Sequence, residues 1–230
     1  LGISLSGTPN GSETLTVNPV SSSIYDLAGN VASTSQSNNS ISLNDKLGPT
    51  MTISSSTVNS GESSNDSTIS LTFTSSESTT NFIKDDITIS NGSLSALSGS
   101  GTTYTATLTP SGDATYTISV AQNKFTDSAG NNNSASNTFN WTYDSTAPTI
   151  SGVTLASDNT TMTVTFNESV YNTNSGSGSL EVSDFVFSLS GGDATLSSTT
   201  PSSISINGNE YTLGISLSGT PNGSETLTVN

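Results

Sequence analysis

Residues 1–18 read LGISLSGTPNGSETLTVN, and the same eighteen letters return as residues 213–230. Their order of apolar, turn and acidic residues is too specific for chance recurrence in a chain rich in small polar residues. The match therefore predicts a tandem array with a period of 212 residues. On this interpretation the chain holds one period plus an overlap, and the residues that follow Asn230 are expected to repeat those from Pro19 onward.

Within the repeated stretch, apolar and polar residues alternate on both sides of a Pro-Asn-Gly turn. Leu1, Ile3 and Leu5 precede the turn, and Leu15 and Val17 follow it. A period of two is typical of strands that bury one face. The stretch therefore predicts two strands joined by a turn.

The composition favours an all-β protein with hydroxyl-rich outer faces. The chain is 30% hydrophobic and only 9% charged, and it contains no cysteine, so disulfides do not hold the fold. About seven short alternating segments per roughly 100 residues, separated by turns, are typical of an immunoglobulin-like sandwich. The fold class that we expect is all-β, with tandem immunoglobulin-like β-sandwich domains.

The repeat divides into two related domains of different length. We expect residues 1–45 to be the C-terminal part of a longer domain, residues 46–144 a complete shorter domain, and residues 145–230 the N-terminal part of the next longer domain. The sequence correspondence between the domains places Met162, Val164 and Phe166 before Glu168 on Ile69, Leu71 and Phe73 before Glu77.

Four segments of the complete domain carry apolar side chains at alternate positions, which predicts four strand faces in its core. They are Ile69, Leu71 and Phe73; Tyr104, Ala106 and Leu108; Tyr116, Ile118 and Val120; and Phe139, Trp141 and Tyr143. The last face is expected in the core rather than as a sugar-binding platform. When Asp45 is aligned with Asp144, Ile41 and Leu43 fall out of phase with these aromatic residues, so a one-residue shift or bulge is needed to restore their facing.

The charge balance excludes several partners. Eighteen acidic residues against three lysines give a net charge of −15, which excludes nucleic acid and disfavours an anionic membrane surface. Multivalent cations are the natural partners of carboxylates that gather at domain junctions. Histidine, cysteine and arginine are absent, so we expect no enzymatic activity.

Three motifs resemble those of a known family. The chain has strands that lead into Asp-x-Ala-Gly-Asn, the terminal strand FNWTYD at 139–144 and the junction DSTAPT at 144–149. It thereby resembles the bacterial Ig-like domains of large repetitive surface adhesins. The resemblance implies a secreted or cell-surface protein of a Gram-negative bacterium, often stiffened by calcium. Long extracellular filaments of marine bacteria belong to the same class, including grappling-hook appendages that contact other cells.

The acidic motifs have two compatible interpretations. Asp-x-Ala-Gly-Asn, at 26–30 and 127–131, is either a hydrogen-bonded turn or part of a Ca²⁺ site. The carboxylates that precede the two junctions are either solvated linker charges or ligands of an ion between consecutive domains. The candidate Ca²⁺ ligands are Asp26, Asn30, Asp45, Glu77, Asp85, Asp86, Asp127, Asn131, Asp144, Glu168 and Asp184.

These observations predict a structural repeat of a long extracellular adhesin or multi-chain filament used for attachment to cells. Its expected partners are copies of itself, in tandem and as parallel chains of a homo-oligomeric filament. A target cell surface or glycan is expected to bind regions outside this sequence. The alternative is an Ig-like module that binds glycan, ice or another surface through a face rich in threonine and serine.

Overall fold

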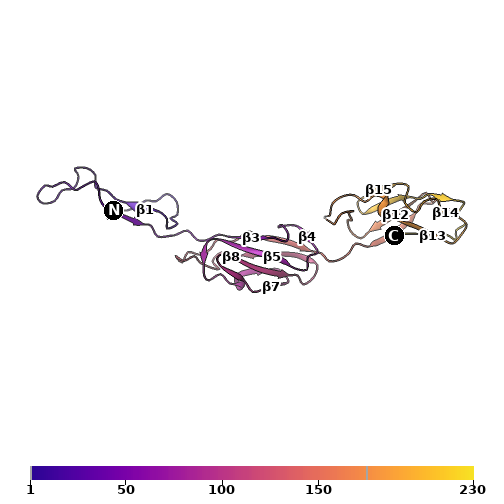
Figure 1. Ribbon diagram of the computed structural model, residues 1–230, viewed down its shortest axis with the longest axis horizontal. Helices are drawn as coiled ribbons and strands as arrows, with labels where there is room; N and C mark the ends of the chain where they lie inside the picture. The colour runs from indigo at the N-terminus through magenta and orange to yellow at the C-terminus, as the bar shows by residue number, and fades with distance from the viewer. Residues whose placement is uncertain (1, 175) are drawn as a thin grey trace. The chain divides into compact units, whose positions relative to one another are not determined.

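The computed structural model describes residues 2–174 and 176–230, so Leu1, which belongs to the first expected strand, lies outside the described residues. The chain divides into two compact units, Leu1–Ser145 and Thr146–Asn230 (Figure 1). In the described residues each unit consists of strands and turns, with one short 3-10 helix, η1 (Lys84–Asp86) or η2 (Val182–Asp184). The expected all-β fold class is confirmed.

The part of the first unit that follows residue 45 is a complete sandwich of two four-stranded sheets (Figure 1). The first sheet has the order β3-β5-β8-β7. Its strands are β3 (Met51–Ser55), β5 (Ile69–Thr79), β8 (Ser98–Thr109) and β7 (Ser93–Leu94). The second sheet has the order β4-β10-β9-β6. Its strands are β4 (Ser63–Ser64), β10 (Phe139–Tyr143), β9 (Ala114–Val120) and β6 (Ile87–Ile89).

The four expected apolar faces meet between these sheets. Trp141 is fully buried, and its indole N–H donates to the Ser64 hydroxyl at 3.0 Å. Tyr143 is partly buried against the same core. The aromatic face of β10 is therefore core, as the sequence predicts.

The last strand, β10, is also held by β4, which pairs with it in parallel. The amides of Thr142 and Asp144 donate to the carbonyls of Glu62 at 3.0 Å and Ser64 at 3.1 Å. The Gly61 amide donates to the Asn140 carbonyl at 2.8 Å. Strand β10, which ends the domain, is thus hydrogen-bonded to the first half of the domain.

The loop between β9 and β10 closes over the edge of β3. Asn137 acts there as a substitute strand residue: its Oδ1 accepts from the Ile53 amide at 2.7 Å, and its Nδ2 donates to the Ile53 carbonyl at 2.9 Å. Asn133, which is buried, fixes the start of the loop. Its Oδ1 accepts from the amides of Lys124 and Phe125, at 2.7 and 3.0 Å. Its Nδ2 donates to the Ala121 carbonyl at 2.9 Å.

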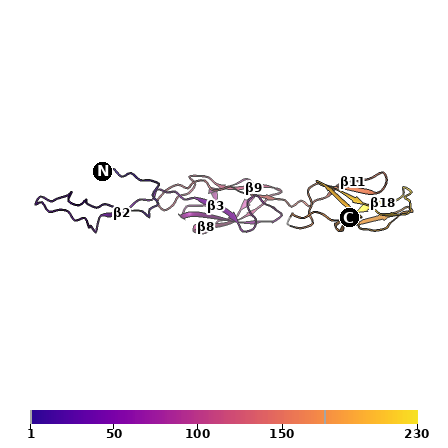
Figure 2. The same ribbon diagram turned by 90° about the horizontal axis from the view of Figure 1, so that it is seen from above.

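The second unit repeats part of this plan. One sheet has the order β11-β12-β16-β15, and two further pairs are β13-β18 and β14-β17. Figure 2 shows β11 and β18, which belong to different sheets of this unit. The strands are β11 (Ile150–Leu155), β12 (Thr161–Phe166), β13 (Phe187–Ser190), β14 (Thr195–Leu196), β15 (Ile204–Asn207), β16 (Glu210–Gly214), β17 (Leu217–Ser218) and β18 (Thr226–Val229).

The strand registers correct the alignment of the two domains. Val164 pairs with Tyr211 just as Phe73 pairs with Tyr104, so Val164, not Phe166, takes the place of Phe73. The alignment predicted from the sequence was therefore wrong by two residues. A shift of two residues leaves the same side chains on the same strand face, so alternation alone cannot detect it. Glu168 still lies four residues after Val164, as Glu77 lies four after Phe73.

The segment 2–45 forms one strand pair, β1 (Thr14–Thr16) with β2 (Ser40–Ser42). The expected strand before the Pro-Asn-Gly turn is wrong for this copy, since none of residues 2–13 lies in a strand. In the second copy the same letters provide the end of β16 and all of β17. There β16 pairs with β12, and β17 pairs with β14.

The register of β1 and β2 restores the facing of Ile41. Leu15 pairs with Ile41, and the Leu43 amide donates to the Glu13 carbonyl at 2.9 Å. Ile41 and Leu43 therefore lie on the same strand face as Leu15. This facing corresponds to a shift of one residue from the alignment of Asp45 with Asp144, as the apolar pattern requires.

We expect Asn133→Ala to lower the free energy of unfolding of the complete domain by about 2–4 kcal/mol, because it leaves the buried Phe125 amide and the partly buried Lys124 amide without an acceptor. Urea unfolding followed by the fluorescence of Trp141, the only tryptophan, measures the change. Asn132→Ala is the matched control. The Asn132 side chain, next to Asn133 in the sequence, is exposed, so the expected change in the free energy of unfolding is within about 0.5 kcal/mol. Equal effects of the two substitutions would contradict this role of Asn133.

Candidate metal site

The Asp-x-Ala-Gly-Asn motif forms a tight turn around its first carboxylate. Asp127 Oδ1 accepts from the amides of Ala129 at 2.8 Å and Asn131 at 2.9 Å, and its Oδ2 accepts from Asn131 Nδ2 at 2.9 Å. Gly130 supplies the left-handed backbone, with φ of +87°, that the turn requires. Because Asp127 is only 7% exposed, the turn places a charged group at the edge of the core.

Three of the predicted ligands come together at this turn. Asp45, Glu77 and Asp127 each offer a carboxylate oxygen, and these atoms lie within 4.8 Å of one another. In the part of the chain that the structure describes, no other such group of three acidic residues occurs. We call Asp45, Glu77 and Asp127 the junction cluster.

Glu77 reaches the junction cluster because β5 is irregular near its end. The pairing register of β5 with β8 shifts between Thr74 and Thr79, and Glu77 lies inside this shift. A shift of this kind re-aims side chains that would otherwise alternate strictly. Glu77 is half-buried there.

Asp45 is held at the junction cluster by the linker that follows it. Its Oδ1 accepts from the Leu47 amide at 2.9 Å. Gly48 lies so close to the Asn132 backbone that a Cβ atom at this position would be 2.0 Å from the Asn132 carbonyl oxygen. The Ser134 amide also donates to the Pro49 carbonyl at 3.0 Å. The linker is therefore docked along the Asp127 turn.

Glu77 and Asp127 differ in how their charges are compensated. Burial, followed by the negative charges of Asp45 and Asp127, raises the pKa of Glu77. Burial also raises the pKa of Asp127, but the hydrogen bonds from Asn131, Ala129 and Gly130 outweigh it, so the pKa lies below its usual value. Ionisation of Glu77 therefore costs more than ionisation of Asp127. Oxygen ligands and concentrated negative charge fit a hard divalent cation such as Ca²⁺.

The other predicted ligands lie elsewhere. Asp26 and Asn30 form the same turn as Asp127 and Asn131, with an Oδ2 to Nδ2 distance of 2.8 Å. Asp86 and Asp184 accept from the amides of Ile83 at 2.9 Å and Glu181 at 2.7 Å. These two acids therefore cap the 3-10 turns η1 and η2.

The remaining three predicted ligands are Asp85, Asp144 and Glu168. Asp85 is exposed at the centre of η1. The Asp144 amide is bonded to β4, and Glu168 Oε1 accepts from Asn167 Nδ2 at 3.5 Å.

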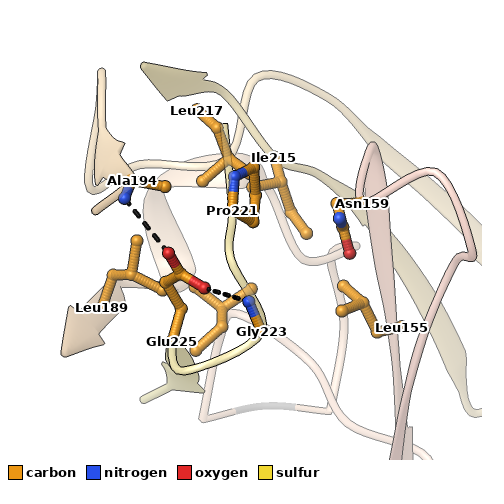
Figure 3. A pocket seen from close by; sticks show the side chains of 10 residues that line it. Leu155, Asn159, Leu189, Ala194, Ile215, Leu217, Pro221, Gly223 and Glu225 are labelled. Atoms are coloured by element: carbon orange, nitrogen blue, oxygen red, sulfur yellow. Dashed lines mark hydrogen bonds between the residues drawn. The ribbon is translucent and has the colours of Figure 1, made fainter. Parts of the chain in front are cut away.

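Sequence reasoning missed the carboxylate of Glu225. It accepts backbone N–H bonds from Asp193 at 2.9 Å, Ala194 at 3.2 Å and Gly223 at 3.0 Å, which join two loops (Figure 3). Burial raises the pKa of Glu225, but hydrogen bonds from the backbone amides of Ala194, Asn222, Glu225 and Asp193 outweigh it and lower the pKa to about 2. The local signal is the Asn-Gly-Ser-Glu turn, in which the Asn222 amide also donates to Glu225.

The sandwich with its docked linker defines an immunoglobulin-like β-sandwich domain. Residues 45–143 match the family model described as a bacterial Ig-like domain, so this part of the chain is similar to domains of that family. A search of curated proteins found no match to the chain. Bacterial Ig-like domains are structural or surface modules, are generally non-catalytic and often occur in extracellular proteins.

No helix within residues 2–174 and 176–230 has the length and apolar character needed to cross a membrane.

We expect Glu77→Gln to have opposite effects with and without divalent cations. Because the pKa of Glu77 is raised in the fold, its ionisation destabilises the cation-free domain as pH rises through that pKa. In chelator at pH 7 the variant should unfold at a higher urea concentration than the wild type, and the difference should shrink as pH falls. Trp141 fluorescence monitors both titrations.

With Ca²⁺ at about 100 times its dissociation constant, the wild type should gain about 2.7 kcal/mol and Glu77→Gln much less. Asp85→Asn removes the same charge from an exposed position of the same domain and should keep the full gain. A wild-type stability that does not respond to Ca²⁺ would overturn the metal site.

Proposed function

We propose that the chain is a structural repeat of a long extracellular adhesin or multi-chain filament used for attachment to cells. The observation that carries the proposal is the docked linker, in which Asp45 at the junction meets Glu77 and Asp127 of the complete domain. A short linker restricts hinge motion, and a cation held by residues on both sides of the linker restricts it further. The repeated sequence at 1–18 and 213–230 supports many copies in series.

The charge distribution supports the same role. Acidic residues are few for the length of the chain, while hydroxyl side chains cover the strand faces that point away from the core. Such faces stay hydrated without strong repulsion, which suits domains that lie in long arrays or beside parallel chains. The target surface would then be bound by regions outside this sequence.

We expect a protein of three tandem repeats to be longer and stiffer in millimolar Ca²⁺ than in chelator. Small-angle X-ray scattering measures the maximum dimension, and Glu77→Gln in every repeat should remove the difference. A maximum dimension that is the same in both conditions would contradict cation stiffening. Light scattering of the same protein gives its mass: several chains indicate a filament subunit, and one chain indicates a single-chain adhesin extender.

A second candidate function is the binding of an ordered surface such as ice or a glycan lattice. The outer faces of β5 and β8 bring exposed or half-buried hydroxyls opposite one another, as Thr74 with Thr103 and Thr72 with Thr105. The second unit pairs Thr163 with Thr212, whose Oγ1 atoms lie 3.1 Å apart. Strands about 4.8 Å apart space such hydroxyls regularly.

If this face binds ice, the chain should lower the freezing point below the melting point and shape ice crystals. Thr105→Lys, at the centre of the face, should abolish both effects because its side chain stands above the hydroxyl plane. Thr88→Lys, on the exposed face of β6 in the other sheet, is the control that should retain them. Absence of ice shaping by the wild type would remove ice as the ligand.

A further inference from the structure

One side of the complete sandwich is open between the outer strands of its two sheets. Strands β6 and β7 each stand at the end of a sheet, and a cavity of about 340 Å³ lies between them. The cavity is lined by Ile87 and Ile89 of β6, by Leu94 of β7, and by Lys84 and Asp85. Ile87 and Ile89 are only partly buried against the core. The two sheets therefore do not seal the core completely on this side.

Both strands have backbone groups that point away from their sheets. The bonding direction alternates along an antiparallel ladder. The Ser95 amide donates to the Thr107 carbonyl at 2.9 Å, so Leu94, one residue earlier, points its amide and carbonyl outward. In the same way the Ser90 amide donates to a carbonyl of β9 at 3.1 Å, so Ile89 points outward. An exposed edge of this kind is a template for pairing with another chain.

The second unit bonds the same edge to its own chain. Ile87 directly follows η1 and Phe185 directly follows η2, so Phe187 corresponds to Ile89, two residues further on. The amide of Phe187 also points away from its partner strand, and it donates to the Thr199 carbonyl at 2.7 Å. A loop of the second unit therefore occupies the position at which a further strand would pair.

This loop is longer than its equivalent in the complete domain. Residues 197–203 connect β14 to β15, whereas residues 95–97 connect β7 to β8. The difference is visible in the burial of the edge strands, since Phe187 is 1% exposed but Ile89 is only partly buried. The shorter domain therefore covers this edge less completely with its own backbone.

A lysine side chain bonds to the open edge of the complete domain instead. Lys84 is the first residue of η1, and its ammonium donates to the outward carbonyl of Leu94 at 2.5 Å. The first residue of η2 is Val182, which carries neither a charge nor a side-chain donor. Three lysines occur in the whole chain, and this one lines the cavity between β6 and β7. The two domains thus protect the same edge in different ways, one with a loop and the other with a charged side chain.

A charged side chain at a strand edge opposes pairing with a second chain. A strand that added to β7 would need the Leu94 carbonyl, which already accepts from the Lys84 ammonium. The incoming strand would either separate the ammonium from this acceptor or bury it beside the apolar lining of the cavity. Both outcomes cost free energy, because a buried charge without a bonding partner is strongly destabilising.

We propose that Lys84 prevents the β6–β7 edge of the complete domain from pairing with the same edge of a second copy of this chain. A second copy is the competitor because an antiparallel edge can pair with itself across a two-fold axis, so every copy carries both halves of the contact. The sequence repeat multiplies this edge along an array and raises its effective concentration. Lys84 thereby leaves the hydroxyl-rich outer faces as the surfaces through which neighbouring chains can meet.

The consequence for neighbouring chains rests on the proposed function, whereas the role of Lys84 rests on contacts inside one domain. Loss of calcium stiffening would leave the role of Lys84 intact. Conversely, failure of this inference would leave the docked linker and the spacer function unaffected.

The test compares Lys84→Val, which installs the residue of the second unit, with the wild-type 230-residue protein. Light scattering over a range of concentrations should show that the variant associates at a concentration at least tenfold lower than the wild type. Lys84→Met, which keeps an unbranched stem, is a second variant with the same expected result. Trp141 fluorescence shows that the complete domain stays folded in each variant.

Two controls separate the position of the charge from its mere loss. Lys124→Val removes the same charge from an exposed position of the same domain and should associate like the wild type. Lys84→Arg keeps a cationic donor at the edge and should also associate like the wild type.

The contact is located by amide hydrogen exchange of the Lys84→Val protein, measured by NMR at low and high concentration. The amides of Ile89 and Leu94 should exchange more slowly as the complex forms, because both point outward from their sheets. Adding Ile89→Pro removes one of these amides without breaking a bond to β9 and should reverse the association. Equal association of Lys84→Val, Lys124→Val and the wild type, or slower exchange confined to other strands, overturns the proposal.

Discussion

The insertion of the last strand between β4 and β9 is the interaction on which the sandwich depends. Strand β10 brings Phe139 and Trp141 into the core, and the loop before it covers β3 through Asn137. Among the described residues of the second unit no strand takes this place, and Val153 is open to solvent. Each domain is therefore completed only by its final residues, through contacts with partners far away in sequence. Such contacts make the fold cooperative, because the first strands cannot bury their apolar face alone.

The order of elements along the chain also brings the acidic residues of the junction cluster together. Strand β2 ends at Ser42 and is followed at once by a short linker, so Asp45 lies beside the Asp-x-Ala-Gly-Asn turn of the domain that follows. Gly48 permits this approach because its missing side chain leaves room for the Asn132 carbonyl. The linker therefore docks at the same place where the carboxylates of Asp45, Glu77 and Asp127 repel one another. A divalent cation would relieve the repulsion without disturbing the docking.

Much of the fold could be predicted from the sequence, because alternation identifies which face of a strand is buried. Trp141, Phe73 and Ile118 lie in the core as their spacing indicates. Alternation does not fix register, and Phe166 was therefore placed two residues away from its true counterpart. For the site, Asp127 and Asp45 were recognisable from the motif and the junction. Asp86 and Asp184 resemble ligands in sequence but cap turns, because local hydrogen bonds to amides use the same carboxylate.

Residues 2–5 set a further limit, since Gly2 and Leu5 lie outside strands whereas the same letters at Gly214 and Leu217 lie in β16 and β17. The parallel pairing of β4 with β10 has a mechanical consequence for a chain of such domains. Tension along the chain pulls on β10 from its C-terminal end, while β4 is anchored in the first half of the domain. The bonds from Thr142 to Glu62, Asp144 to Ser64 and Gly61 to Asn140 are then loaded in shear. Bonds in shear share the force and must break together, so the domain resists extension more than a hairpin that unzips one bond at a time.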